Sequence, residues 1–103
     1  MFHEISQAMQ ERMRHLEHLD AEQRQRDLPV PQRFCQVPPE TGRFLAILAA
    51  AAPDGGCVEV GTSAGYSTLW LWLARRGRGP RLKTCESSAW KREVARETFR
   101  LCE

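Results

Sequence analysis

The sequence predicts an α/β chain in which two short parallel strands alternate with helices, after two helices at the N-terminal end. Three observations support this prediction. Apolar residues recur with the period of a helix through the first 26 residues. Two short runs, at 57–60 and 81–86, alternate as strands do, and each precedes a helix-like segment. Turns rich in glycine and proline separate these segments. The strand–helix alternation favours a parallel sheet of the doubly wound type.

Length and composition limit the chain to one small domain. It has 103 residues, of which 42% are hydrophobic and 27% charged, and its formal net charge is +2. This charge is too small to predict nucleic-acid binding by itself. No apolar run has the length of a membrane span, and the first 28 residues are too charged for a targeting peptide. We therefore expect a cytoplasmic protein without a nucleic-acid or membrane partner.

The cysteines and histidines predict no metal site. The four cysteines form no Cys-x-x-Cys pair, and we expect them to be free and reduced. His15 and His18 share one helix face but have no third ligand in view, so we expect both to be exposed.

Residues 3–26 predict a surface helix. Its apolar stripe is narrow, and its polar face is wide. Such a helix covers a sheet or pairs with another chain. The stripe consists of Phe2, Ile5, Met9, Met13, Leu16 and Leu19. Paired prolines then flank a stretch at 32–37 that we expect to be irregular.

The remaining elements are predicted from apolar content. Residues 40–51 and 65–76 have broad apolar faces, so we expect both helices to be buried. The strands at 57–60 and 81–86 are also expected to be buried, and a helix at 89–101 follows. Two parallel strands alone do not form a stable sheet. Either further chain or a second copy of this chain is expected to complete it.

The loop after the first strand carries the main functional signal. A phosphate-binding P-loop is excluded because Tyr66, not lysine, follows Gly65. A dinucleotide site is disfavoured because Ser63 occupies the position of the middle glycine. Glu59, just before the loop, would repel a pyrophosphate. These features favour a ligand that carries an ammonium group together with a carboxylate.

A second acid is expected beside this loop. Glu86 ends the second predicted strand. The carboxyl ends of neighbouring parallel strands lie at one edge of the sheet. Glu86 could therefore accept hydrogen bonds from the hydroxyls of a ribose. An amino-acid end together with a ribose describes S-adenosylmethionine.

The segment Val58–Leu69, VEVGTSAGYSTL, resembles the first motif of S-adenosylmethionine-dependent methyltransferases. Its Gly-Thr-x-x-Gly-Tyr-Ser form is most similar to the catechol and caffeoyl-CoA type of O-methyltransferases. Residues 39–45 also resemble the segment that precedes this motif in that family, and the whole resemblance covers about residues 37–102. It implies a Rossmann-like methyltransferase fold that is truncated. Residues 1–28 would form an N-terminal cover helix, and 29–103 the first part of the cofactor-binding domain.

The resemblance also implies roles for individual residues. Glu59 and Gly61 would help to hold the methionine amine, and Glu86 would bind the ribose. Ser67 would contact the methionine carboxylate, and Val37 the methionine end. The complete implied set is Val37, Glu59, Gly61, Thr62, Ser63, Gly65, Ser67 and Glu86.

The implied activity is methyl transfer to the hydroxyl of a small molecule, achieved by aligning donor and acceptor. In the family a divalent metal lowers the pKa of the acceptor hydroxyl. The resemblance places the metal-binding acids and the substrate wall in later strands than these 103 residues include. No catalytic residue or metal ligand is therefore predicted, and enzymatic activity of this chain is left open. The alternative is a truncated, non-catalytic remnant that acts as an oligomerisation or interaction module.

A basic cluster surrounds the loop before the second strand. No aromatic stacking platform is interleaved with its charges. We expect a solvated turn rather than a site for nucleic acid or an anionic substrate. The cluster comprises Arg75, Arg76, Arg78, Arg81 and Lys83.

Overall fold

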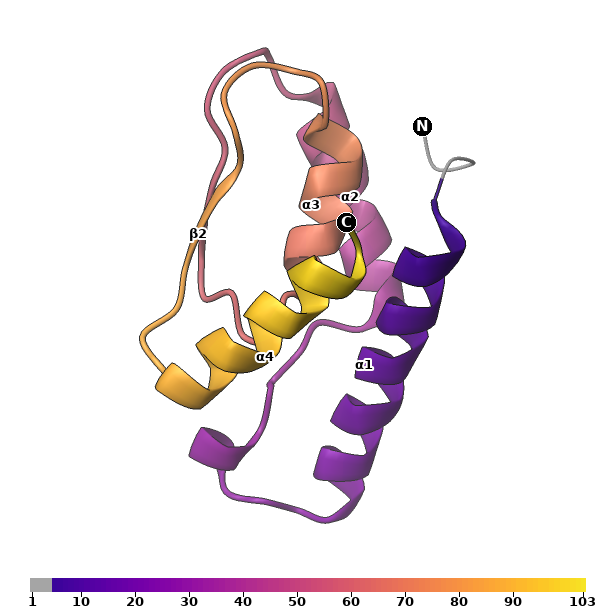
Figure 1. The fold of residues 1–103 in the computed structure, drawn as a ribbon, viewed down its shortest axis with the longest axis vertical. Coiled ribbons are helices and arrows are strands. Elements are labelled where there is room, and N and C mark those ends of the chain that lie inside the picture. Colours follow the sequence, from indigo (N-terminus) through magenta and orange to yellow (C-terminus); the bar gives the residue numbers. More distant parts are fainter. Residues whose placement is uncertain (1–4) are drawn as a thin grey trace.

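The computed structural model describes residues 5–103 and contains the predicted elements in the predicted order (Figure 1). Phe2 of the predicted apolar stripe lies outside the described residues. The strands are shorter than expected, because only three residue pairs are in register. The elements are α1 (Gln7–Gln25), the 3₁₀ helix η2 (Val30–Gln32), α2 (Pro39–Ala51), β1 (Val58–Val60), α3 (Tyr66–Arg75), β2 (Lys83–Cys85) and α4 (Ala89–Leu101).

The two strands are parallel, as predicted, and α3 connects them. Glu59 lies opposite Thr84 in the register, and both are partly buried. Val60 lies opposite Cys85, and the Gly61 amide N–H extends the pairing by donating to the Cys85 carbonyl at 2.7 Å. This pairing brings the ends of both strands to one edge of the sheet.

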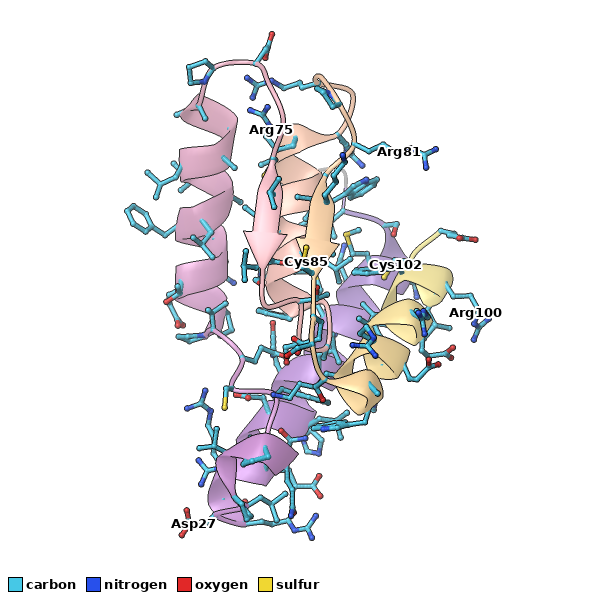
Figure 2. The ribbon with its side chains drawn as sticks, turned by 90° about the vertical axis from the view of Figure 1, so that its left-hand side faces the viewer. Asp27, Arg75, Arg81, Cys85, Arg100 and Cys102 are labelled. Carbon is cyan, nitrogen blue, oxygen red and sulfur yellow. The ribbon has the colours of Figure 1, made fainter. Side chains whose placement is uncertain are left out.

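The prediction that both strands are buried was wrong. Val58 and Val60 are 65% and 87% exposed, and Cys85 is exposed as well. Figure 2 shows the two strands in front of α3, with no helix over the face toward the viewer. A parallel sheet is buried on both faces only where helices cover both. Within residues 5–103 they cover one.

The prediction that α2 is deeply buried was also wrong. Its Phe44, Ile47 and Leu48 are 58%, 53% and 52% exposed. The helix packs on α3 through a narrow strip that includes Gly42. A Cβ at Gly42 would lie 2.3 Å from the Trp70 ring, so this glycine allows the close approach. The apolar residues outside the strip have no cover in the described part of the chain.

The core consists mainly of side chains of α1 and α3. The predicted stripe of α1 is confirmed, since Met9, Met13 and Leu16 are at most 5% exposed. The α3 helix is buried on several sides, as expected, through Tyr66, Leu69, Trp70 and Leu73. His15 and His18 are exposed, and all four cysteines are free, as predicted. None of the helices described is long and apolar enough to cross a membrane.

Part of the basic cluster is not a solvated turn. Arg75 is 7% exposed, and its guanidinium donates to carbonyl groups of α2 and of the turn that follows it. Arg78 donates to further carbonyls there and pairs with Asp54. The last carbonyls of a helix have no donors within the helix, and cations are favourable at that end. The two arginines therefore stabilise the C-terminal end of α2. The carbonyls belong to Ala49, Pro53 and Gly55 for Arg75, and to Ala50 and Ala52 for Arg78.

Candidate functional site

The loop at residues 61–65 begins where β1 ends and leads directly into α3. The amide N–H groups of Gly61 and Thr62 both donate to the Cys85 carbonyl oxygen, at 2.7 and 3.1 Å. Gly61 and Gly65 have φ angles of 94° and 93°, a left-handed conformation that glycine adopts without strain. The loop is therefore fixed to the end of β2, and its two glycines permit its shape.

Glu86 lies beside this loop, as predicted. Its Oε1 accepts a hydrogen bond from the Ser63 amide at 2.7 Å, and its Oε2 accepts one from the Ser88 amide at 3.0 Å. Both hydrogen bonds lower the pKa of Glu86 below its ordinary value, and the one from Ser88 has the larger effect. An ionised carboxylate has about four acceptor positions, so about two remain for ligand hydroxyls. The ribose contact of Glu86 itself stays a prediction.

The Glu59 side chain is hydrogen-bonded on the α3 side of the sheet. Its carboxylate accepts hydrogen bonds from the hydroxyls of Ser67 at 2.6 Å and Thr84 at 2.8 Å, and from that of Thr68. These contacts tie β1 to β2 and to the first turn of α3. Because the Ser67 hydroxyl donates to Glu59, its donor is in use in this arrangement. The ligand contacts proposed for Glu59 and Ser67 stay predictions.

Three other predicted residues lie in or beside the same loop or pack against the core. Thr62 is buried, and its hydroxyl is hydrogen-bonded to that of Thr84. Gly65 is buried, and a Cβ there would lie 3.0 Å from the Phe99 ring. Val37 packs, partly buried, against the core. The structure thus joins Thr62, Ser63 and Glu86 through hydrogen bonds to the strands or the loop, whereas Val37 is placed only by its packing against the core.

Sequence reasoning missed the role of Phe34. Its carbonyl oxygen accepts a hydrogen bond from the Ser63 hydroxyl at 2.7 Å. Its ring stacks on Trp90, with ring centroids 5.6 Å apart, and the Trp90 indole N–H donates to the Pro31 carbonyl at 3.2 Å. Phe34 lies in a stretch without periodicity, so no sequence pattern indicated these contacts. The irregular stretch that contains Phe34 therefore lies directly beside the loop.

Across residues 5–103, no three His, Cys, Asp or Glu side chains gather as ligands of a metal ion would.

Comparisons with known proteins bear on the family. No protein-family model matches the sequence. A Mycobacterium tuberculosis protein, catechol O-methyltransferase, is 42% identical over 59 residues, which are 55% of this chain and 26% of that protein.

Two solved structures are similar in fold. The O-methyltransferase from Bacillus cereus, in complex with S-adenosylhomocysteine, matches with a TM-score of 0.63 and 28% identity, over 89% of this chain and 38% of that one. TomG, an O-methyltransferase of Streptomyces achromogenes involved in tomaymycin synthesis, was solved in complex with S-adenosylmethionine. It matches with a TM-score of 0.64 and 27% identity, over 92% of this chain and 37% of that one.

The chain spans about a quarter of the length of the curated relative and under two fifths of each solved structure. The similarity in sequence and the similarity in fold agree on one family. This chain is related to the S-adenosylmethionine-dependent O-methyltransferases and corresponds to part of their Rossmann-like fold.

Proposed function

We propose that this chain carries the S-adenosylmethionine-binding part of an O-methyltransferase that acts on the hydroxyl of a small molecule. The observation that carries the proposal is the pairing of Glu86 with the Ser63 amide, at 2.7 Å, where both strands end. Residues 1–28 would form a cover helix, and 29–103 part of the cofactor domain. The cofactors named for the two solved neighbours support this assignment.

The residues around the loop fit such a ligand. The remaining acceptor positions of Glu86 suit the two hydroxyls of a ribose. No heavy atom outside its immediate chain neighbours lies within 4 Å of a Cβ position at Gly61, so the backbone there is open to close approach. The Gly61 carbonyl would accept from the amine, and the amides at the start of α3 would donate to the carboxylate. When bound, the cofactor would supply an electrophilic methyl group, and this chain would hold and orient it. A divalent metal belongs to the proposal only for the complete fold, and no ligand for it is assigned in this chain.

Replacing Glu86 with glutamine is expected to weaken the binding of S-adenosylhomocysteine roughly tenfold or more. The variant keeps an acceptor for the Ser63 amide but loses the charge, and hydrogen bonds to charged groups are worth about 1.5–3 kcal/mol. Isothermal titration calorimetry measures the effect. The matched control is Glu97→Gln, because Glu97 is exposed and pairs with Arg100 on α4. Absence of binding by the unaltered chain would contradict the cofactor claim and leave the fold unaffected.

The pH dependence of binding provides a separate check. Because hydrogen bonds lower the pKa of Glu86, its carboxylate is protonated at a lower pH than an ordinary glutamate, whose pKa is near 4.3. The contribution of Glu86 to affinity should therefore be lost with a midpoint below that value. Loss of affinity centred at or above the ordinary value would argue against Glu86 as the ligand's partner.

A second candidate function is an interaction module. Phe44, Ile47 and Leu48 of α2 are more than half exposed, as are Val58 and Val60 of β1. Clusters of exposed apolar side chains are typical of interfaces. If this candidate is right, the chain self-associates with increasing concentration, and Ile47→Glu reduces that association in light scattering. Val30→Glu is the control, because Val30 is 65% exposed but lies on η2. A monomer at every concentration would exclude self-association.

A further inference from the structure

We propose that α1 positions the loop at residues 61–65, and thereby sets the affinity for the cofactor, through side chains that do not touch the ligand. The inference rests on the proposed function for its ligand. Three polar side chains of α1 connect to Ser63 and Ala64 of the loop and to Tyr66, the first residue of α3. Figure 1 shows the chain after α1 turning back alongside this helix on its way to α2.

The first connection is a continuous series of hydrogen bonds from α1 to Glu86. The Oε1 of Gln23 accepts from the Phe34 amide at 2.8 Å. The Phe34 carbonyl accepts from the Ser63 hydroxyl at 2.7 Å, and the Ser63 amide donates to Glu86 Oε1 at 2.7 Å. Ser63 itself has a φ angle of 50°, which is uncommon for a residue other than glycine. Contacts on both its amide and its hydroxyl hold it in that conformation.

Two charged side chains of α1 also hold the backbone at Gln36, two residues after Phe34. Asp20 accepts from the Gln36 amide at 3.2 Å, while Arg24 donates to the Gln36 carbonyl at 2.9 Å. Asp20 and Arg24 also pair with each other at 2.8 Å. Cys35, between the two anchored residues, has a φ angle of 52°. The backbone at 34–36 is therefore fixed from α1 on both sides of a left-handed residue.

Two further connections from α1 reach Tyr66, which follows the loop directly, and Ala64 within it. The Tyr66 hydroxyl donates to the Glu17 carboxylate at 2.5 Å, and Tyr66 is 1% exposed. The Arg12 guanidinium donates to the Thr98 hydroxyl at 3.0 Å, and that hydroxyl donates to the Ala64 carbonyl at 2.7 Å. Thr98 is fully buried. Hydrogen bonds in such protected positions restrict the loop more than exposed ones would.

Fixing a binding loop before the ligand arrives removes an ordering cost from binding. A loosened connection should therefore weaken binding even when the chain stays folded. Gln23 tests this most cleanly, because the hydrogen bond that its side chain makes within residues 5–103 is with the Phe34 amide, and the Phe34 carbonyl in turn accepts from Ser63. This makes Gln23 a positioning residue and not a ligand contact.

The test compares Gln23→Met with Gln25→Met, the same change at an exposed glutamine on the same helix. Binding of S-adenosylhomocysteine is titrated by calorimetry well below the unfolding temperature. Gln23→Met should weaken binding about three- to tenfold, the factor expected for one lost hydrogen bond. Gln25→Met should leave affinity unchanged, and Gln23→Glu, which keeps an acceptor, should restore most of it. Hydrogen exchange of the Ser63 amide, followed by NMR without ligand, should become faster in Gln23→Met alone.

Unchanged affinity and unchanged Ser63 exchange in Gln23→Met would overturn the inference. So would an equal loss of affinity in Gln25→Met, or no recovery in Gln23→Glu. If the unaltered chain binds no cofactor, the proposed function fails. Faster Ser63 exchange in Gln23→Met would then still support the control of the loop by α1, and unchanged exchange would refute it.

Discussion

Replacing Arg75 with methionine is expected to destabilise the chain by about 2–4 kcal/mol. The guanidinium is buried and donates to the carbonyl oxygens of Ala49 at 3.3 Å, Pro53 at 3.2 Å and Gly55 at 2.6 Å. Methionine fills the space of the side-chain stem but leaves these carbonyls without their donors. For a chain of this size, the melting temperature should fall by roughly 10–20 °C, measured by circular dichroism.

Two further variants separate this effect from a general loss of charge. Arg81→Met removes an exposed arginine of the same basic cluster, and Figure 2 shows Arg81 extending away from the strands. Its melting temperature should stay within a few degrees of the unaltered chain. Arg75→Lys keeps the charge, but an ammonium group cannot span three carbonyls as a planar guanidinium does. We expect it to recover only part of the loss. Equal destabilisation by Arg75→Met and Arg81→Met would refute the bridging role.

Much of the fold could be predicted because its signals are local. The stripe of α1 was predicted from residue spacing within one helix. The turn at 61–65 was predicted from its two glycines, which have positive φ angles in the structure. The meeting of Glu86 with the loop also followed from a general rule, since neighbouring parallel strands end at one edge of the sheet.

The wrong predictions all concern contacts between distant segments. Apolar content at α2 and β1 predicted burial, but burial also requires a partner, and the described residues provide none for Phe44 or Val60. Arg75 was predicted to belong to a solvated turn. Instead it stabilises the end of α2, whose carbonyls lie 20 to 26 residues earlier in the chain. The sequence shows that a basic residue lies near a turn, but not which distant carbonyl groups its side chain contacts.

The candidate site was likewise predicted in its position but not in its contacts with distant segments. The motif located the loop, and the rule on parallel strands placed Glu86 beside it. Neither indicated the hydroxyls that donate to Glu59 or the hydrogen bond from Ser63 to Phe34. On α1, Asp20, Gln23 and Arg24 lie within one helical turn and look like ordinary solvated side chains in the sequence. Their function appears only once the stretch at 34–36 folds back along the helix.

Replacing Gly65 with alanine should destabilise the chain by about 2–5 kcal/mol and weaken cofactor binding. Its φ angle of 93° costs an alanine about 1–2 kcal/mol. A Cβ at this position would also lie 3.0 Å from Phe99 Cε1 and 3.3 Å from Thr98 Cγ2, which adds an overpacking cost of roughly 1–3 kcal/mol. Urea unfolding measures the total.

Gly61→Ala separates the two contributions, because Gly61 has nearly the same φ angle, 94°, but open space around its Cβ position. It should cost only the backbone strain, about 1–2 kcal/mol. If the difference between the two variants arises at Phe99, then Phe99→Leu should relieve part of the Gly65→Ala penalty. The two changes together would then destabilise the chain less than the sum of their separate effects. Additive effects would show that α4 does not restrict the loop through Phe99, and backbone strain and the contact with Thr98 would then account for the glycine at position 65.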